Sequence, residues 1–278
     1  MVTITIFYII MIILLMFVIY SVFIPYGYIS DLINKPKRTR IIEKYDDLIS
    51  ACEWGDVELV KQYIYKGIDV NMCEGLLLKR AYNFDRKNII YLLIDTGNVK
   101  NEHLWWVFIC ACLDEHITLI LDLISKGISV DIYDGRALKE ASERGSLGIV
   151  KLLIDSGADI NARKGEAFMF ACGYRHLDII KLFISKGVNV NNMDGKALIE
   201  ASERGNTDIV KILIDAKADV NAQNGEALIR ACECNNVDVV KLLIESGADI
   251  HIQNDKPIKV AQYKNSERLE KIFKDAIK

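Results

Sequence analysis

The sequence predicts an all-α solenoid, a stack of short helix-turn-helix repeats, and three regularities carry that prediction. Alanine recurs every 30 residues in eight copies, at Ala51, Ala81, Ala111, Ala141, Ala171, Ala201, Ala231 and Ala261. A large apolar residue stands three positions before each alanine, and a glycine column runs from Gly67 to Gly247 with Lys217 as its exception. An apolar stripe fills the interval between them. Tandem copies of one unit explain all three, because stacked repeats bury their apolar faces on one another.

The first element of each unit is a short helix, as in residues 136–144. Leu138, Ala141 and Ser142 share one face at helical spacing. An alanine methyl on that face lets neighbouring first helices approach closely. A larger side chain there would overpack the stack at a cost of roughly 1–3 kcal/mol. We therefore expect the alanine column to be buried between repeats.

The second element is a helix from Gly148 to Ser156, which follows a break at residues 145–146. Its apolar residues again lie on one side, and Gly157 follows where a left-handed residue ends a helix. Neither helix exceeds about three turns, so neither is stable alone in water. Residues 158–162 are then expected to run extended into a polar turn at 163–165, so that each unit ends in a loop or hairpin arm.

Several of these segments resemble an ankyrin repeat. They are Gly-Ala-Asp-Ile-Asn-Ala at 157–162, its near copies at 218–222 and 247–250, and Gly145 followed by Ile-Val-Lys-Leu-Leu-Ile at 149–154. The resemblance covers roughly residues 44–278 and implies an ankyrin-type α-solenoid.

The resemblance departs from the family pattern in two respects. The family's period is 33 residues with a Thr-Pro-Leu-His opening, whereas this chain has a period of 30 and reads Ala-Leu-Lys-Glu-Ala at 137–141. We therefore expect shorter hairpin fingers and a less rigid arm. Shortened repeats of this kind are similar to those of ankyrin proteins in giant DNA viruses.

The columns divide the repeat domain, residues 44–278, into about eight repeats. Their boundaries fall at 44–74, 75–104, 105–134, 135–164, 165–194, 195–224, 225–254 and 255–278. The second repeat loses the pattern after Gly97. The last repeat is expected to be a terminal cap, because charged residues surround Leu269, Ile272 and Phe273.

Residues 1–28 are predicted to form a single N-terminal hydrophobic transmembrane helix. The uncharged residues 2–24 span roughly 34 Å as a helix, enough to cross a bilayer core. A basic linker, 29–43, carries Lys35, Lys37, Arg38 and Arg40, and such charges favour the cytosolic side. We expect a single-pass membrane protein whose repeats face the cytosol. A cleaved signal peptide, or a hydrophobic helix docked on the repeats, is the alternative interpretation.

Charge and cysteine content limit the function classes. The 35 basic and 38 acidic side chains nearly balance and form no basic stripe, so we expect no nucleic acid partner. Four of the seven cysteines directly follow an alanine of the column, at Cys52, Cys112, Cys172 and Cys232. We expect these thiols to be buried, reduced and space-filling. Cysteines two residues apart diverge by about 200° on a helix and therefore make a poor metal site.

No catalytic constellation is visible in the sequence. The four histidines are scattered, and there is no His-Glu-x-x-His pair, Gly-x-Ser-x-Gly elbow or phosphate-binding glycine loop. We therefore predict a non-enzymatic protein without cofactor, metal or small-molecule substrate.

Partner-binding residues are expected at loop tips and on the exposed side of the first helix, as the ankyrin resemblance implies. The candidates are Trp54, Phe84, Trp106, Tyr174, Arg144 and Arg204. Exposed rings in a concave groove bury much area at a low entropy cost. The alternative interpretation is that the rings cover irregular repeat joints and that the arginines are solvated surface.

The predicted function is that of a membrane-anchored adaptor, which binds a protein partner through its concave face without catalysis. If the chain is viral, that partner would be a host protein. Two alternatives stay open: a substrate receptor for a ubiquitin ligase or another host-interaction factor, and a structural spacer whose membrane helix self-associates. No Gly-x-x-x-Gly pair supports self-association.

Overall fold

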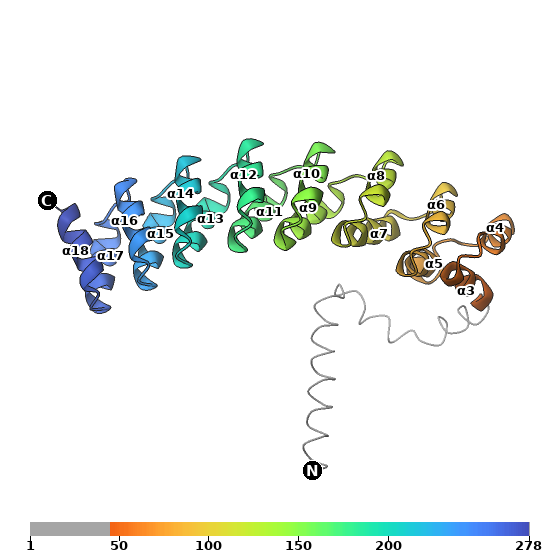
Figure 1. Ribbon diagram of the computed structural model, residues 1–278, viewed down its shortest axis with the longest axis horizontal. Coiled ribbons are helices and arrows are strands. Elements are labelled where there is room, and N and C mark those ends of the chain that lie inside the picture. Colours follow the sequence, from red (N-terminus) through yellow and green to blue (C-terminus); the bar gives the residue numbers. More distant parts are fainter. Residues whose placement is uncertain (1–44, 278) are drawn as a thin grey trace, which may run out of the picture. The chain divides into compact units, whose positions relative to one another are not determined.

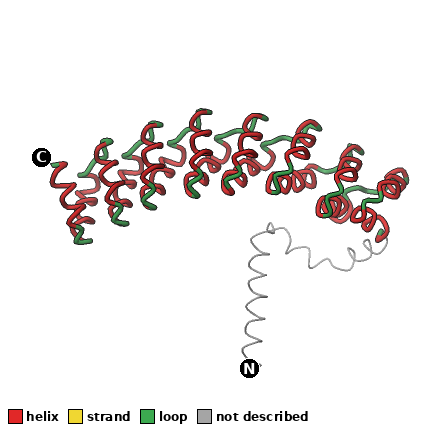
Figure 2. The backbone as a smooth tube through the Cα atoms, viewed as in Figure 1, coloured by secondary structure: helices red, strands yellow, loops and turns green. Residues whose placement is uncertain are grey.

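The computed structural model describes residues 45–277, which form helices joined by short turns and contain no strand (Figures 1 and 2). The chain divides into two compact units: unit 1 ends at His103 and unit 2 begins at Leu104. The predicted transmembrane helix and basic linker lie outside the described residues. None of the helices within residues 45–277 is both long enough and apolar enough to cross a bilayer.

Unit 1 stacks helix pairs in two layers. In the described part of the unit, α3 (Asp46–Trp54) packs on α5 (Met72–Asn83), and α4 (Val57–Tyr65) packs on α6 (Lys87–Asp95). Each first helix also packs on its own second helix. The first helices therefore form one layer and the second helices form another.

Unit 2 repeats this arrangement after α7 (Asn101–Leu113) and α8 (Ile117–Ser125). The later first helices are α9 (Ile132–Arg144), α11 (Ala162–Gly173), α13 (Asn192–Glu203), α15 (Ala222–Glu233) and α17 (Ile252–Tyr263). The second helices are α10 (Leu147–Asp155), α12 (Leu177–Ser185), α14 (Thr207–Asp215), α16 (Val237–Glu245) and α18 (Glu267–Ala276). From α9 to α17 each first helix contacts the next, while pairs such as α10 and α12 contact one another in the second layer (Figure 1).

The alanine column lies in the core, as predicted. Every alanine from Ala51 to Ala261 is at most 4% exposed. Leu138 and Phe168, three residues before their alanines, are buried as well. A methyl group at this position therefore sets how closely neighbouring first helices pack.

The four thiols that follow the alanine column are also buried, as predicted. Loss of hydration raises the pKa of Cys52, Cys112, Cys172 and Cys232 to about 12. Because the thiolate is the reactive form, these side chains are inert fillers at neutral pH. Cys234, by contrast, is exposed.

The predicted hairpin arms are wrong for the described repeats. The segment expected to be extended instead turns at once, and α11 begins at Ala162. Arg163, Lys164 and Gly165 then adopt left-handed φ values of 52°, 60° and 78° before the right-handed helix resumes. The same left-handed turn recurs at 73–75, 133–135, 193–195, 223–225 and 253–255. A β-hairpin requires extended backbone, which these residues do not adopt.

A glycine ends most of these turns for two physical reasons. The left-handed φ disfavours a side chain, and the next repeat approaches closely. A Cβ on Gly165 would lie 2.5 Å from Nδ2 of Asn192, and one on Gly135 would lie 2.6 Å from the Cβ of Ala162. The turn therefore also sets the contact between successive repeats.

The third repeat lacks this turn. Trp105 stands where the neighbouring repeats have glycine, and residues 103–105 are absent from the left-handed positions. Within unit 1, the ring of His103 lies against Gly75, where a Cβ would be 2.5 Å from the histidine Cγ. Burial lowers the pKa of His103, which is 6% exposed, so the ring is neutral at pH 7.

Asparagine side chains join the loops of successive repeats. Asn191 accepts a hydrogen bond from the Asp219 backbone N–H (2.8 Å) and donates one to the Lys217 carbonyl (3.2 Å). The same pair of bonds recurs from Asn71 and Asn221. The lack of the family's Thr and His suggested a less rigid arm, and this asparagine ladder supplies bonds between repeats instead.

The turn between the two helices of a repeat also bonds to the preceding repeat. The side chains of Arg86, His176 and Asn236 donate to carbonyls of that repeat at 2.8, 3.0 and 2.8 Å, respectively. Wherever this occurs, the turn of the preceding repeat contains glycine, at Gly55, Gly145 and Gly205. A Cβ on Gly145 would lie 2.5 Å from Cε1 of His176.

A second solution operates where that turn position carries a polar side chain. Ser146 donates to Glu115 Oε1 at 2.6 Å, and Ser266 donates to Asn235 Oδ1 at 2.8 Å. A small residue on one repeat thus pairs with a larger one on the repeat before.

The last repeat has the character of a cap, as predicted. Leu269 and Phe273 are buried, while Glu267, Lys271 and Lys274 on the opposite side of α18 are exposed. The polar face ends the stack with charged groups in water.

Candidate partner-binding surface

Aromatic and charged side chains from successive repeats of unit 2 touch one another at the surface of the first-helix layer. The rings of Trp105 on α7 and Tyr133 on α9 lie 4.6 Å apart between centroids. The Arg136 guanidinium lies 5.5 Å from the centre of the Trp105 ring. Its Nε also lies 3.4 Å from Glu140 Oε1. The arginine therefore links an aromatic pair to a carboxylate.

Lys139 continues the same run of contacts towards the next repeat. Its Nζ lies 2.8 Å from Glu143 Oε2 and 4.5 Å from the centre of the Phe170 ring. Burial disfavours the ammonium, but the hydrogen bond to Glu143 and the charges of Glu140 and Glu143 outweigh that effect and raise the pKa of Lys139. The lysine therefore stays charged at neutral pH.

Tyr174, at the end of α11, completes the run. Its hydroxyl donates to Glu143 Oε1 at 3.2 Å, and its ring stacks with those of Phe170 and His176 at 6.2 and 6.3 Å. More than half of the tyrosine, 55%, remains exposed. We call this surface the aromatic strip. Its members are Trp105, Tyr133, Arg136, Lys139, Glu140, Glu143, Phe170 and Tyr174.

The aromatic strip can bind by shape and side-chain contact. Its charges are already paired and its rings already contact one another, so little side-chain freedom remains to be lost on binding. Large rings also bury much area when a partner covers them.

Comparison with known proteins identifies the fold family. A family model described as ankyrin repeats (three copies) matches residues 48–164, 138–224 and 168–254. The chain belongs to the ankyrin-repeat family. The period of 30 residues and the left-handed turns are this chain's own version of the ankyrin repeat.

Two individual ankyrin proteins illustrate the similarity. The ankyrin repeat protein YahD of Escherichia coli K12 is 27% identical over 116 residues, which are 38% of this chain and 58% of YahD. The chain thus spans less than two thirds of that relative's length. The crystal structure of an ankyrin repeat domain from Acinetobacter baumannii AYE superposes with a TM-score of 0.56 and 26% identity, and the match covers 61% of this chain and 96% of that one.

The structure brings some of the candidate residues of this ankyrin stack together and leaves others apart. Tyr174 lies in the aromatic strip. Trp106 is half-buried, and its neighbour Trp105, which sequence reasoning passed over, contributes the exposed ring contact. The available signal was that Trp105 interrupts the glycine column. Arg144 is exposed, and Arg204 donates to the Gly173 carbonyl of the preceding repeat at 3.3 Å.

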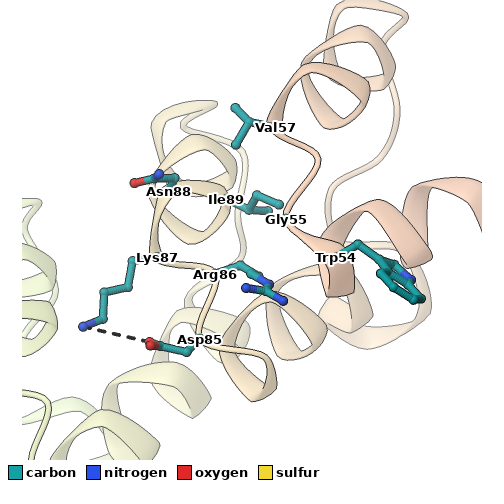
Figure 3. Close-up of a pocket in the computed structure, with 8 residues that line it drawn as sticks. All are labelled: Trp54, Gly55, Val57, Asp85, Arg86, Lys87, Asn88 and Ile89. Atoms are coloured by element: carbon teal, nitrogen blue, oxygen red, sulfur yellow. Dashed lines mark ion pairs between the residues drawn. The ribbon is translucent and has the colours of Figure 1, made fainter.

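Trp54 and Phe84 lie in unit 1, where they are 80% and 44% exposed. Trp54 borders a hollow of about 290 Å³ lined by Gly55, Val57 and residues 85–89 (Figure 3). Figure 3 places the Trp54 ring and the Lys87 amine at opposite ends of this hollow. Lys87 lies 3.9 Å from Asp85 Oδ1. The hollow is therefore a polar surface depression beside an exposed indole.

Residues 45–277 contain no group of three or more His, Cys, Asp or Glu side chains placed to hold a metal ion. The surfaces described above hold rings and ion pairs, which suit protein recognition.

Proposed function

We propose that this ankyrin-repeat chain is a non-catalytic adaptor that holds a protein partner on the aromatic strip. Ankyrin repeats are interaction modules, and the continuous contact of rings and ion pairs from Tyr133 to Tyr174 supports this surface as the binding site. Three repeats contribute side chains to it. A partner lying across them would bury the rings together, which is the arrangement that binding hot spots favour.

We also propose that residues 2–24 anchor the adaptor in a membrane with the repeats in the cytosol. The support is the sequence: 23 uncharged residues followed by four basic ones between Lys35 and Arg40. Carbonate extraction of the expressed full-length chain tests the anchor. Retention in the membrane pellet is expected, and release into the soluble fraction would exclude integral insertion.

Proximity labelling of the full-length chain tests the strip. The variant Phe170→Ala/Tyr174→Ala removes two stacked rings and is expected to lose the strongest labelled partners. Tyr263→Ala is the matched control, because Tyr263 is 84% exposed and does not belong to the strip. An unchanged set of partners in the double variant would reject the strip as the binding surface.

The hollow in unit 1 requires a separate variant, Trp54→Ala/Phe84→Ala. If partners disappear from this variant and not from Phe170→Ala/Tyr174→Ala, the binding surface lies in unit 1. The ubiquitin-ligase receptor, the structural spacer and the viral origin stay predictions from the sequence.

A further inference from the structure

The second-helix layer of unit 2 carries a row of lysines, one per repeat. The fifth residue of each of the last five second helices is an exposed lysine; these are Lys151, Lys181, Lys211, Lys241 and Lys271. We call this set the lysine row. It lies in the second-helix layer, whereas the aromatic strip lies in the first-helix layer.

Helix α8 interrupts the row with an apolar residue. Leu121 occupies the fifth position and is 49% exposed. Ile117, one turn earlier on the same face, is 47% exposed, and Leu147 on α10 is 40% exposed. The Ser146–Glu115 hydrogen bond of 2.6 Å places the starts of α8 and α10 side by side. Ile117, Leu121 and Leu147 are therefore one exposed group, which we call the apolar patch.

The lysines nearest the apolar patch have no carboxylate bound to them. Among the described residues, Lys151, Lys181 and Lys211 form no ion pair, whereas Lys241 lies 3.8 Å from Glu245 Oε1. Asp178, one turn before Lys181, and Asp155, one turn after Lys151, are on the same helices. The uncompensated positive charge is thus confined to a narrow line that begins at the apolar patch.

We propose that the apolar patch and the adjoining lysines bind an amphipathic helix of a partner protein, which lies along the row across α8, α10 and α12. The partner helix carries an apolar side chain followed by two carboxylates at intervals of about seven residues. Its apolar side chain covers Leu121 and its carboxylates meet Lys151 and Lys181. This site does not depend on the aromatic strip.

The spacing argument comes from helix geometry. Packed helices lie about 8–10 Å apart, so the lysine row advances by that distance with each repeat. A helix rises 1.5 Å per residue, and about seven residues therefore cover one repeat. Seven residues are also close to two full turns, which keeps successive side chains on one face.

The acidic neighbours make the register selective. A partner carboxylate displaced from the row would approach Asp155 or Asp178 and be repelled, since like charges at short range disfavour binding. Partners with acidic residues at other spacings are therefore expected to bind more weakly.

The test uses a synthetic, fluorescently labelled 22-residue helical peptide with leucine at position 4 and glutamates at positions 11 and 18. Its anisotropy is titrated with the full-length chain in detergent micelles. We expect saturable binding that Leu121→Lys weakens at least tenfold. This substitution installs the residue that five other repeats carry, so it leaves the fold intact, and thermal unfolding checks that it does.

Charge reversal supplies the matched pair of variants. Lys181→Glu is expected to weaken binding at least fivefold, while Lys241→Glu, at the same position two repeats away, leaves it within twofold. A control peptide with its glutamates moved by two residues should bind at least fivefold more weakly. No binding by the wild-type chain, or equal binding to Leu121→Lys or to the shifted peptide, overturns the proposal.

Two further measurements separate the other occupants. A dimer in sedimentation that Leu121→Lys dissolves would assign the patch to a second copy of the chain, and flotation with anionic vesicles that requires Leu121 would assign it to lipid. Either result overturns the partner helix.

Discussion

Each repeat contacts the one before it at two polar turns, which solve the same problem differently. The loop after the second helix repeats one device, the asparagine ladder, from Asn71 to Asn221. The turn between the helices uses either a glycine facing a large donor such as His176, or a larger polar residue facing serine. The difference teaches that a backbone in a fixed position can be held by one conserved group, whereas a turn that contacts a variable neighbour needs matched pairs.

The largest expected effect tests the glycine solution. Gly145→Ala forces a side chain into a backbone with φ of 79° and displaces His176 from the Glu143 carbonyl. We expect a loss of about 2–3 kcal/mol in the free energy of unfolding, from the left-handed residue and the broken hydrogen bond together. Urea denaturation of the full-length chain in micelles measures it.

Gly157→Ala is the matched control for this contact. Its φ is 94°, but no heavy atom lies within 4 Å of a Cβ there. The loss should therefore be about 1–2 kcal/mol, from the backbone alone. Equal losses in the two variants, or a difference that persists when His176 is already alanine, would show that the histidine contact contributes nothing.

An intermediate effect is expected in the asparagine ladder. Asn191→Ala removes a donor and an acceptor, and should destabilise the chain by about 1–2 kcal/mol. Asn191→Asp should recover part of that, because Asp131 stands naturally at the equivalent position and accepts from Asp159 N–H at 2.9 Å. Denaturation of both variants decides the matter, and an aspartate no better than alanine would contradict the ladder.

The smallest effect belongs to the serine solution. Ser146→Ala removes the bond to Glu115, which is exposed, so the loss should be about 0.5–1 kcal/mol. Thermal unfolding measures this change. A loss as large as that of Gly145→Ala would make the two solutions equivalent in strength and remove the contrast drawn here.

Much of this fold follows from residue spacing. The alanines and the Leu138 column predict which side of each first helix is buried, because burial repeats with the period. The left-handed turns did not follow, since Arg163 and Lys164 are residue types that rarely take positive φ and nothing local in the sequence requires it. That conformation is fixed by the approach of the next repeat to Gly165.

The candidate surface was less predictable than the fold. Tyr174 could be placed at the end of a first helix from its column alone. Trp105 could not, because its exposure depends on the absence of the left-handed turn in its own repeat. The lysine row is periodic, but whether Lys151 or Lys241 has a carboxylate bound to it depends on rotamers that the sequence leaves open.

The buried thiols give this protein built-in probes of local opening. Cys52, Cys112, Cys172 and Cys232 stand at 60-residue intervals, each shielded by its own repeat and its neighbours. An alkylating reagent can modify them only when that neighbourhood opens, so the order in which they are labelled would report how the stack frays, segment by segment, without any engineered reporter group.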